Sequence, residues 1–122
     1  MPFTHEMTPT LIRLDFTGTV TNEDLLRVGA VAAELEAGLA VIPGRIVDFT
    51  SSEGLAISFN GILALAETRR ARRYPNAFRT AILVKNDGQR GFARMFQTLM
   101  SHSQVTVEIF DTAEAALAWL AE

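Results

Sequence analysis

Cysteine is missing from this chain of 122 residues. Its absence excludes disulfide bonds, zinc sites built from thiolates and a cysteine nucleophile. A chain without thiols suits a reducing compartment, where disulfides would not persist.

Long hydrophobic runs are missing as well. No uninterrupted apolar stretch approaches the roughly 20 residues that span a bilayer. The first seven residues, Met1–Met7, contain neither the basic region nor the apolar region of a signal peptide. We therefore expect a soluble, cytoplasmic protein with no transmembrane segment.

Neither sign of charge is in large excess. The chain has 14 acidic and 11 basic residues and a net charge of -3. This balance gives no electrostatic reason to expect a nucleic acid as the partner. The hydrophobic fraction of 48% is that of an ordinary globular chain. We predict a single domain over residues 1–122.

Motifs of catalysis and cofactor binding are also missing. The two histidines, His5 and His102, have no partner at metal-ligand spacing. No nucleophile elbow, dinucleotide fingerprint or Walker loop occurs, and the glycine pair in residues 88–91 is too short for a phosphate loop. The sequence therefore predicts no metal, no cofactor and no catalytic residues.

The most informative stretch that is present runs from residue 79 to residue 100. Thr80–Val84 is a short apolar run with β-branched residues, which is typical of a strand buried on both faces. Turn-forming residues follow at 85–88. Apolar side chains then recur at helical spacing, at Phe92, Met95, Phe96, Leu99 and Met100. Strand, turn and helix are half of a βαβ unit.

The rest of the chain also alternates between strands and helices. Residues 3–20 predict a β-hairpin, and Thr21 with Asp24 predicts the capping box of a helix that ends before Gly38. Next we expect a strand at 45–49, a loop at 50–54, a helix at 58–73, a strand at 104–110 and a last helix capped by Asp111 with Glu114. This order predicts an α/β domain with an open, mostly parallel sheet of about five strands and helices on both faces.

Two of these helices have apolar stripes that should face the core. The stripe of the helix at 58–73 is Phe59, Ile62, Leu63 and Ala66. The stripe of the last helix is Ala113, Ala116, Leu117 and Leu120.

Three segments resemble the small bacterial SpoIIAA-like proteins. They are Gly18–Thr21, Gly91–Phe96 and Phe110–Leu120. These proteins are a branch of the STAS superfamily with structural kinship to CRAL-TRIO lipid-binding domains. The resemblance spans nearly the whole chain, and it implies the same α/β fold and a regulatory or protein-interaction function.

In STAS anti-sigma antagonists, a serine at the start of a helix is the phosphorylated switch. Ser58 is the serine nearest the corresponding helix start, so the resemblance makes it the candidate phosphoacceptor. A phosphate there would meet free N–H groups and the positive end of the helix dipole. The family's Asp-Ser pattern is altered, because Ile57 replaces the aspartate and Phe59-Asn60 replaces small residues. Alternatively, Ser58 is only an N-cap.

Polar residues follow two predicted strands and form a candidate ligand crevice. Ligands of open α/β sheets bind outside the carboxyl ends of the strands. A small polar or anionic ligand could bind there, or these could be ordinary loop residues, with Asn86 or Asp87 capping a helix. The candidates are Asp48, Thr50, Ser51, Ser52, Lys85, Asn86, Asp87, Arg90 and Arg94.

A basic patch ends the helix at 58–73. It contains Arg69, Arg70, Arg72 and Arg73. These arginines could bind an anion, a membrane surface or an acidic partner. Alternatively, they complement the negative end of the helix dipole.

Aromatic and methionine side chains allow one further interpretation. Phe92, Met95, Phe96, Met100 and Trp119 could line a cavity for an acyl chain, or they could fill an ordinary core. Three functions therefore stay open. The first is a non-enzymatic regulatory or interaction module, which we expect to self-associate. The second is a carrier of a small apolar or anionic ligand, and the third is an enzyme of unknown class.

Overall fold

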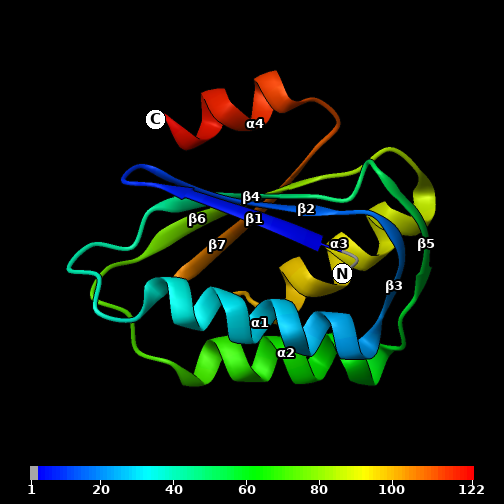
Figure 1. Cartoon of the computed structure of the whole chain (residues 1–122), viewed down its shortest axis with the longest axis horizontal. Coiled ribbons are helices and arrows are strands. Elements are labelled where there is room, and N and C mark those ends of the chain that lie inside the picture. The colour runs from blue at the N-terminus through cyan, green and yellow to red at the C-terminus, as the bar shows by residue number, and fades with distance from the viewer. Residues whose placement is uncertain (1–2) are drawn as a thin grey trace.

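A mixed sheet of five strands lies at the centre of the computed structural model, which describes residues 3–122. The strand order is β1-β2-β4-β6-β7. β1 (Phe3–Thr8) and β2 (Leu11–Phe16) form the antiparallel hairpin predicted from the sequence. β4 (Gly44–Asp48), β6 (Phe78–Leu83) and β7 (Val105–Phe110) continue the sheet in parallel. The expected open, mostly parallel sheet is confirmed (Figure 1).

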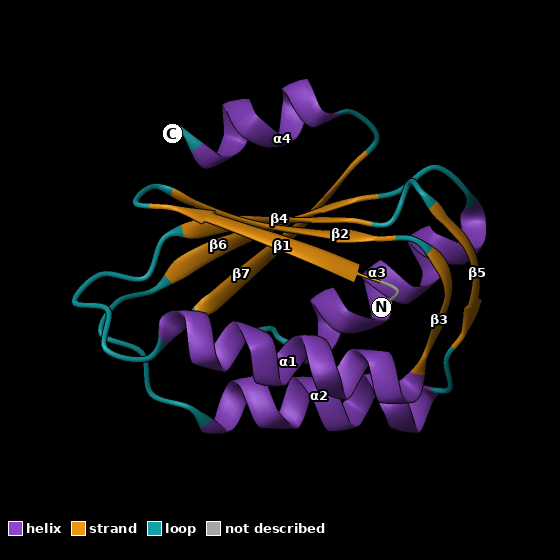
Figure 2. Cartoon of the chain, in the orientation of Figure 1, coloured by secondary structure: helices purple, strands orange, loops and turns teal. Residues whose placement is uncertain are grey.

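Helices cover both faces of this sheet, as predicted. α1 (Asn22–Glu36), α2 (Phe59–Ala71) and α3 (Asp87–Leu99) lie on one face, and α4 (Ala113–Leu120) lies on the other (Figure 2). α1 and α2 run parallel, because their N-termini contact each other and Glu36 near the end of α1 contacts Arg69 near the end of α2.

The larger core lies between the sheet and α1, α2 and α3. Phe16 stacks on Phe49 with ring centroids 4.6 Å apart, and Phe49 meets the edge of Phe92 at 4.9 Å. A smaller core under α4 contains Ile46, Ala81, Leu83 and Ala116. β6 contributes to both cores, so the prediction of a strand buried on both faces is correct.

One pair of strands was not predicted. β3 (Gly18–Thr21) pairs in parallel with β5 (Ser52–Ala56) in a separate two-stranded sheet. The prediction of a loop over residues 50–54 is therefore wrong from Ser52 onward. These strands are short and rich in polar residues, and each is ordered by a partner more than 30 positions away. These two segments have no local pattern of alternating hydrophobic residues that would predict such a pair.

The helix caps were predicted with mixed success. The capping box of α1 is confirmed, since the Thr21 N–H donates to Asp24 Oδ2 at 2.8 Å and the Asp24 N–H donates to Thr21 Oγ1 at 3.3 Å. The assignment of Asp111 as the cap of α4 is wrong. Thr112 is the N-cap and accepts from the Ala115 N–H at 3.2 Å, while Asp111 forms an ion pair with Arg90.

Some residues assigned to apolar stripes face solvent. Phe59 is 53% exposed, Met95 46% and Leu117 47%, and Ala113 is exposed as well. Helical spacing identifies which residues share a face, but a residue at the margin of the stripe or in a terminal turn can extend beyond the neighbouring element.

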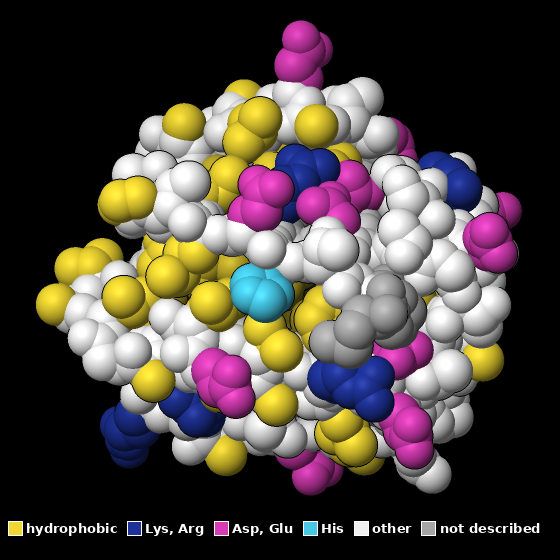
Figure 3. Space-filling view, viewed as in Figure 1, with side chains coloured by type: hydrophobic (Ala, Val, Ile, Leu, Met, Phe, Trp, Pro, Cys, Tyr) yellow, Lys and Arg dark blue, Asp and Glu magenta, His cyan; other side chains and the backbone are white. Residues whose placement is uncertain are grey.

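In the space-filling view, hydrophobic side chains are visible between β1 and α1, and positive and negative side chains are interspersed (Figure 3).

Candidate functional site

Ser58 lies at the N-terminus of α2, where it is joined to the N-terminus of α1. Its hydroxyl accepts from the Gly61 N–H at 3.2 Å and from Asn22 Nδ2 at 3.0 Å. The Ser58 N–H donates in return to Asn22 Oδ1 at 3.1 Å. Ser58 is therefore an N-cap, as the simpler prediction had it, and its side chain is exposed.

Gly61 makes this junction sterically feasible. A Cβ atom at position 61 would lie 2.0 Å from Asn22 Oδ1, well inside contact distance. The glycine thus lets the Asn22 side chain reach across to Ser58. The two helix N-termini are thus joined through the Asn22 side chain, which binds both the hydroxyl and the backbone N–H of Ser58.

Three of the polar residues predicted to form a ligand crevice, Asp48, Thr50 and Ser52, form hydrogen bonds within the protein. Asp48 accepts from the Thr50 N–H at 2.8 Å and from Arg13 Nη2 at 3.0 Å. Ser52 is buried, and its hydroxyl donates to the Phe49 carbonyl at 2.8 Å. Buried Gln89, which sequence reasoning missed, donates to the Ser52 hydroxyl at 3.0 Å. These groups hold the ends of the strands together.

The remaining members of the crevice set lie on the surface of the same end. Asn86 is the N-cap of α3, and Arg90 pairs with Asp111. Ser51, Lys85, Asp87 and Arg94 are exposed. None of the nine predicted crevice residues lines either of the two pockets described below.

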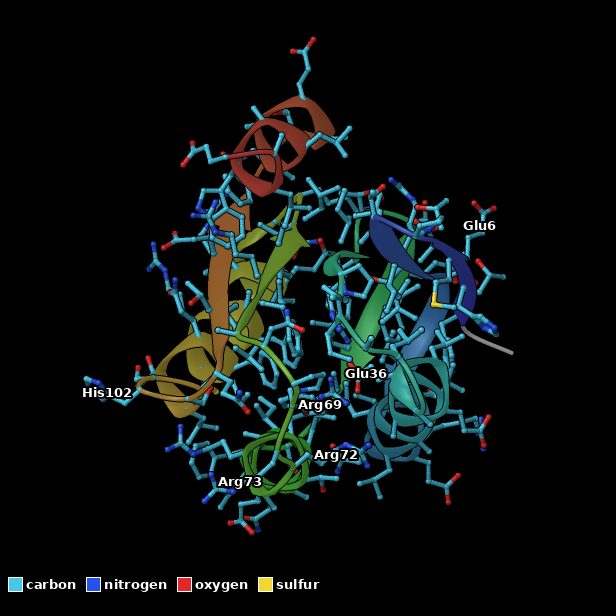
Figure 4. The ribbon with its side chains drawn as sticks, turned by 90° about the vertical axis from the view of Figure 1, so that its left-hand side faces the viewer. Glu6, Glu36, Arg69, Arg72, Arg73 and His102 are labelled. Atoms are coloured by element: carbon cyan, nitrogen blue, oxygen red, sulfur yellow. The ribbon has the colours of Figure 1, made fainter. Side chains whose placement is uncertain are left out.

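The predicted basic patch at the other end of α2 is divided between the interior and the surface. Arg69 is only 6% exposed and turns inward. Its Nη1 donates to Glu36 Oε1 at 3.0 Å, and its Nη2 donates to Glu36 Oε2 at 2.5 Å, so both oxygens of the buried carboxylate are bound. Arg45, at the start of β4, donates from Nη1 to the same Oε2 at 2.5 Å. Figure 4 shows Glu36 and Arg69 meeting between α1 and α2.

This buried Glu36–Arg45–Arg69 cluster does not balance its charges. Two guanidinium groups share one carboxylate, and Nε and Nη2 of Arg45 are buried without a hydrogen-bond partner among the described residues. Burial lowers the pKa of the Arg45 guanidinium, and the charge of Glu36 opposes that effect.

The pKa of Glu36 shifts in the direction that keeps the carboxylate charged. Burial by itself raises this pKa, but the hydrogen bonds and charges of Arg69 and Arg45 together hold it below the ordinary value of 4.5. Burial also raises the pKa of the Tyr74 hydroxyl, which donates to the Arg69 carbonyl at 3.0 Å. The cluster is therefore tied into the end of α2 by both charge and hydrogen bonds.

The exposed arginines line an outer pocket of about 340 Å³. Arg72 and Arg73 lie at the end of α2, and His102 projects from the turn between α3 and β7 (Figure 4). His102 has a φ of 63°, a conformation that non-glycine residues adopt infrequently. Arg70 instead donates to the carbonyls of Leu99 and Ser101 at the end of α3.

An inner cavity of about 70 Å³ lies between the sheet and the three helices. Its walls are mainly apolar and include Phe92, Phe96 and Met100, as the cavity hypothesis predicted. Two residues of that hypothesis were wrongly placed, because Met95 is exposed and Trp119, a residue of α4, packs against the opposite face of the sheet. Arg69 and Val105 line both the inner cavity and the outer pocket, which are therefore adjacent.

Comparison with known proteins gives matches in structure but not in sequence. No family model matches the chain, and the search of curated proteins finds no match. An uncharacterised protein of the DUF3478 family from Shewanella loihica, with a SpoIIAA-like fold, superposes with a TM-score of 0.61 at 19% identity, over 97% of this chain and 91% of the other. The chain has the SpoIIAA-like fold.

Two structures of SpoIIAA itself share this SpoIIAA-like fold with the chain. The unphosphorylated form of the anti-sigma factor antagonist gives a TM-score of 0.62 at 15% identity, over 98% of this chain and 96% of the other. The phosphorylated form from Bacillus gives 0.55 at 18% identity, over 97% and 98%. The resemblance predicted from the sequence is thus confirmed at the level of the fold.

Within this SpoIIAA-like fold, sequence reasoning missed Glu36 and Arg45. Glu36 falls four residues after Ala32 on the buried stripe of α1, and Arg69 falls three residues after Ala66 on that of α2. Opposite charges on two inward stripes are the signal that could have paired them. No helix of residues 3–122 is long and apolar enough to cross a membrane, and these residues contain no group of three acidic or histidine side chains placed to hold a metal.

Proposed function

We propose that the chain is a non-enzymatic regulatory module that binds another protein at the joined N-termini of α1 and α2. The observation that carries this proposal is the SpoIIAA-like fold over 97% or more of the chain, together with Ser58 exposed at a helix N-terminus. Two of the similar structures are an anti-sigma factor antagonist without and with a phosphoryl group.

Ser58 has the chemistry of a switch. Its exposed hydroxyl stands at the positive end of α2, where free N–H groups favour an anion. Its two hydrogen-bond donors, the Gly61 N–H and Asn22 Nδ2, could transfer to phosphate oxygens after phosphorylation. Modification would thus change the connection between α1 and α2 at the surface where the partner binds.

Exposed hydrophobic side chains beside this junction supply the contact surface. Phe59 follows Ser58 and is 53% exposed, and Leu26 in the second turn of α1 is 52% exposed. Exposed apolar side chains of this size could contribute contact area to a bound protein. The internally hydrogen-bonded carboxyl ends of the strands favour this surface over a catalytic crevice.

Site-specific photocrosslinking in the native host tests the proposal. A photoreactive residue replaces Phe59 in one variant and Met95 in a control, because Met95 on α3 is similarly exposed at 46%. We expect a discrete protein adduct from position 59 that position 95 does not give. The added substitution Ser58→Asp should change its yield, because a carboxylate partly imitates a phosphate.

Two outcomes of this experiment would contradict the proposal. Identical adducts from both positions would show that the crosslinks report only random collisions. No adduct from position 59, with normal expression and folding, would show that this surface binds no protein. Mass spectrometry of Ser58→Ala and wild-type protein from the same cells would then show whether Ser58 carries a phosphoryl group.

A further inference from the structure

The excess positive charge in the buried cluster requires an anion. Glu36 neutralises one guanidinium of the two that contact it, so the cluster has a net charge of +1 in the protein interior. Buried charge without a counter-ion is strongly unfavourable. The two N–H donors of Arg45 without a partner lie in the same cluster.

The unpartnered atoms of Arg45 have the geometry that a carboxylate requires. Nε and Nη2 lie on one edge of the planar guanidinium, where their N–H bonds point in parallel and can donate to both oxygens of a carboxylate. Nη1, on another edge, is already occupied by Glu36. The Phe78 ring covers a flat face of the guanidinium, with its centroid 4.2 Å from Cζ, and therefore leaves the edge free.

The Arg45 side chain lines the inner cavity, and its neighbour Thr80 on β6 does so as well. The other walls are almost entirely apolar, with Phe92, Phe96 and Met100 among them. At roughly 10–15 Å³ for each enclosed water-sized atom, 70 Å³ accommodates about five to seven non-hydrogen atoms. The cavity thus suits a short hydrocarbon chain with an anionic group at one end.

The outer pocket provides a route to this cavity. Arg69 and Val105 form a wall of both spaces, and Arg72, Arg73 and His102 surround the outer one. Positive side chains at the mouth attract anions and raise their rate of association. An anion that passes Arg69 reaches the buried cluster directly.

We propose that the inner cavity binds a short-chain monocarboxylate, whose carboxylate pairs with the free edge of Arg45 and whose chain lies among the aromatic residues. The bound carboxylate brings the cluster to two positive and two negative charges. Water would satisfy the donors but leave the charge, and an inorganic anion would leave the apolar walls unfilled. This site lies at the opposite end of α2 from Ser58 and is independent of the function proposed above.

Calorimetric titration of the whole chain with three probes tests the ligand class. Pentanoate has both the carboxylate and the chain, pentan-1-ol has only the chain, and acetate has only the carboxylate. We expect pentanoate to bind about tenfold more tightly than either of the others, because charge-assisted hydrogen bonds and chain burial are both required. Equal affinity for pentan-1-ol and pentanoate would overturn the assignment of the carboxylate.

Substitutions in the site separate the two parts of the ligand. Arg45→Met removes the charge and the free donors but leaves the Glu36–Arg69 pair intact, so the variant should fold. It should weaken pentanoate binding about tenfold and leave pentan-1-ol binding unchanged. Arg94→Met, which removes an exposed arginine of α3, should change neither affinity. Unchanged pentanoate binding in folded Arg45→Met would overturn the proposal.

A second variant keeps the test decisive if Arg45→Met does not fold. Ala32 is a small cavity-lining residue of α1, and Ala32→Met places additional atoms inside the cavity. It should weaken the binding of pentanoate and pentan-1-ol together by about tenfold, while circular dichroism and the melting temperature confirm an intact fold. Full pentanoate affinity in a folded Ala32→Met protein would overturn the proposal, because it would show that the ligand's chain binds elsewhere.

Discussion

The polar groups at the two ends of α2 differ in their exposure to water. At the N-terminal end, Ser58 and Asn22 exchange hydrogen bonds at the surface, where water can replace any bond that breaks. At the C-terminal end, Glu36, Arg45 and Arg69 are buried, and an unpaired group has no such substitute. The first end can be modified at small cost in stability, whereas removal of a charged partner at the second end leaves a buried charge unpaired and costs much more.

Removal of Glu36 should give the largest effect. Glu36→Ala leaves two buried guanidiniums facing each other, and we expect the free energy of unfolding to fall by ~3–5 kcal/mol in urea denaturation. Glu34→Ala, an exposed glutamate of the same helix, should change it by less than ~0.5 kcal/mol. Similar values for the two variants would remove the contrast between the ends of α2.

Acid should weaken the buried end selectively. The pKa of Glu36 is lower in the folded protein than its ordinary value of 4.5, so its contribution to stability is complete above that value. The contribution is lost as the pH falls below 4.5 toward the folded pKa, because the unfolded chain then binds the proton more readily. Urea midpoints measured at descending pH should fall more steeply for wild type than for Glu36→Gln. Parallel curves would show that Glu36 does not titrate in this range.

Gly61→Ala should test the exposed end at its most crowded point. Alanine favours a helix by up to ~1 kcal/mol over glycine, but its Cβ would collide with Asn22 Oδ1. We expect a net loss of ~1 kcal/mol in a thermal melt, because Asn22 must turn away and release Ser58. The double variant with Asn22→Ala should recover the helix gain. A single variant that is already more stable than wild type would show that Asn22 moves freely.

Loss of the Ser58 cap should have the smallest effect of the four. Ser58→Ala removes the acceptor of the Gly61 N–H at an exposed position, at a cost of ~0.5 kcal/mol, the lower end of the range for an N-cap. Ser58→Gly, measured in the same denaturation experiment, should cost only a few tenths of a kcal/mol relative to wild type. If both variants exceed the effect of Glu36→Ala, the comparison between the two ends is reversed.

Sequence patterns predicted the features that depend on residues close together in the sequence. The buried run at residues 80–84, the capping box of Thr21 with Asp24 and the β1–β2 hairpin each depend on neighbours a few positions away. Helical spacing also identified Phe92, Phe96 and Met100 as one face of a helix, and the structure shows that this face lines the inner cavity. The α/β fold class follows from the alternation of strands and helices.

Sequence patterns failed where distant segments decide. β5 is extended because β3 lies beside it, and Glu36 is buried because Arg45 and Arg69 come to it from other elements. The sequence predicted polar residues at the carboxyl ends of the strands, but it did not reveal that Gln89 of α3 donates there to the Phe49 carbonyl and the Ser52 hydroxyl.

The position of β1 has a consequence for local opening. β1 is an edge strand, and only Phe3 of its six residues is buried. β6, by contrast, is paired on both sides and covered on both faces. Amide protons of β1 should therefore exchange with solvent through brief detachment of the strand, while those of β6 should wait for global unfolding. The slowest-exchanging amides then report the stability of the whole chain, and the fastest report only its edge.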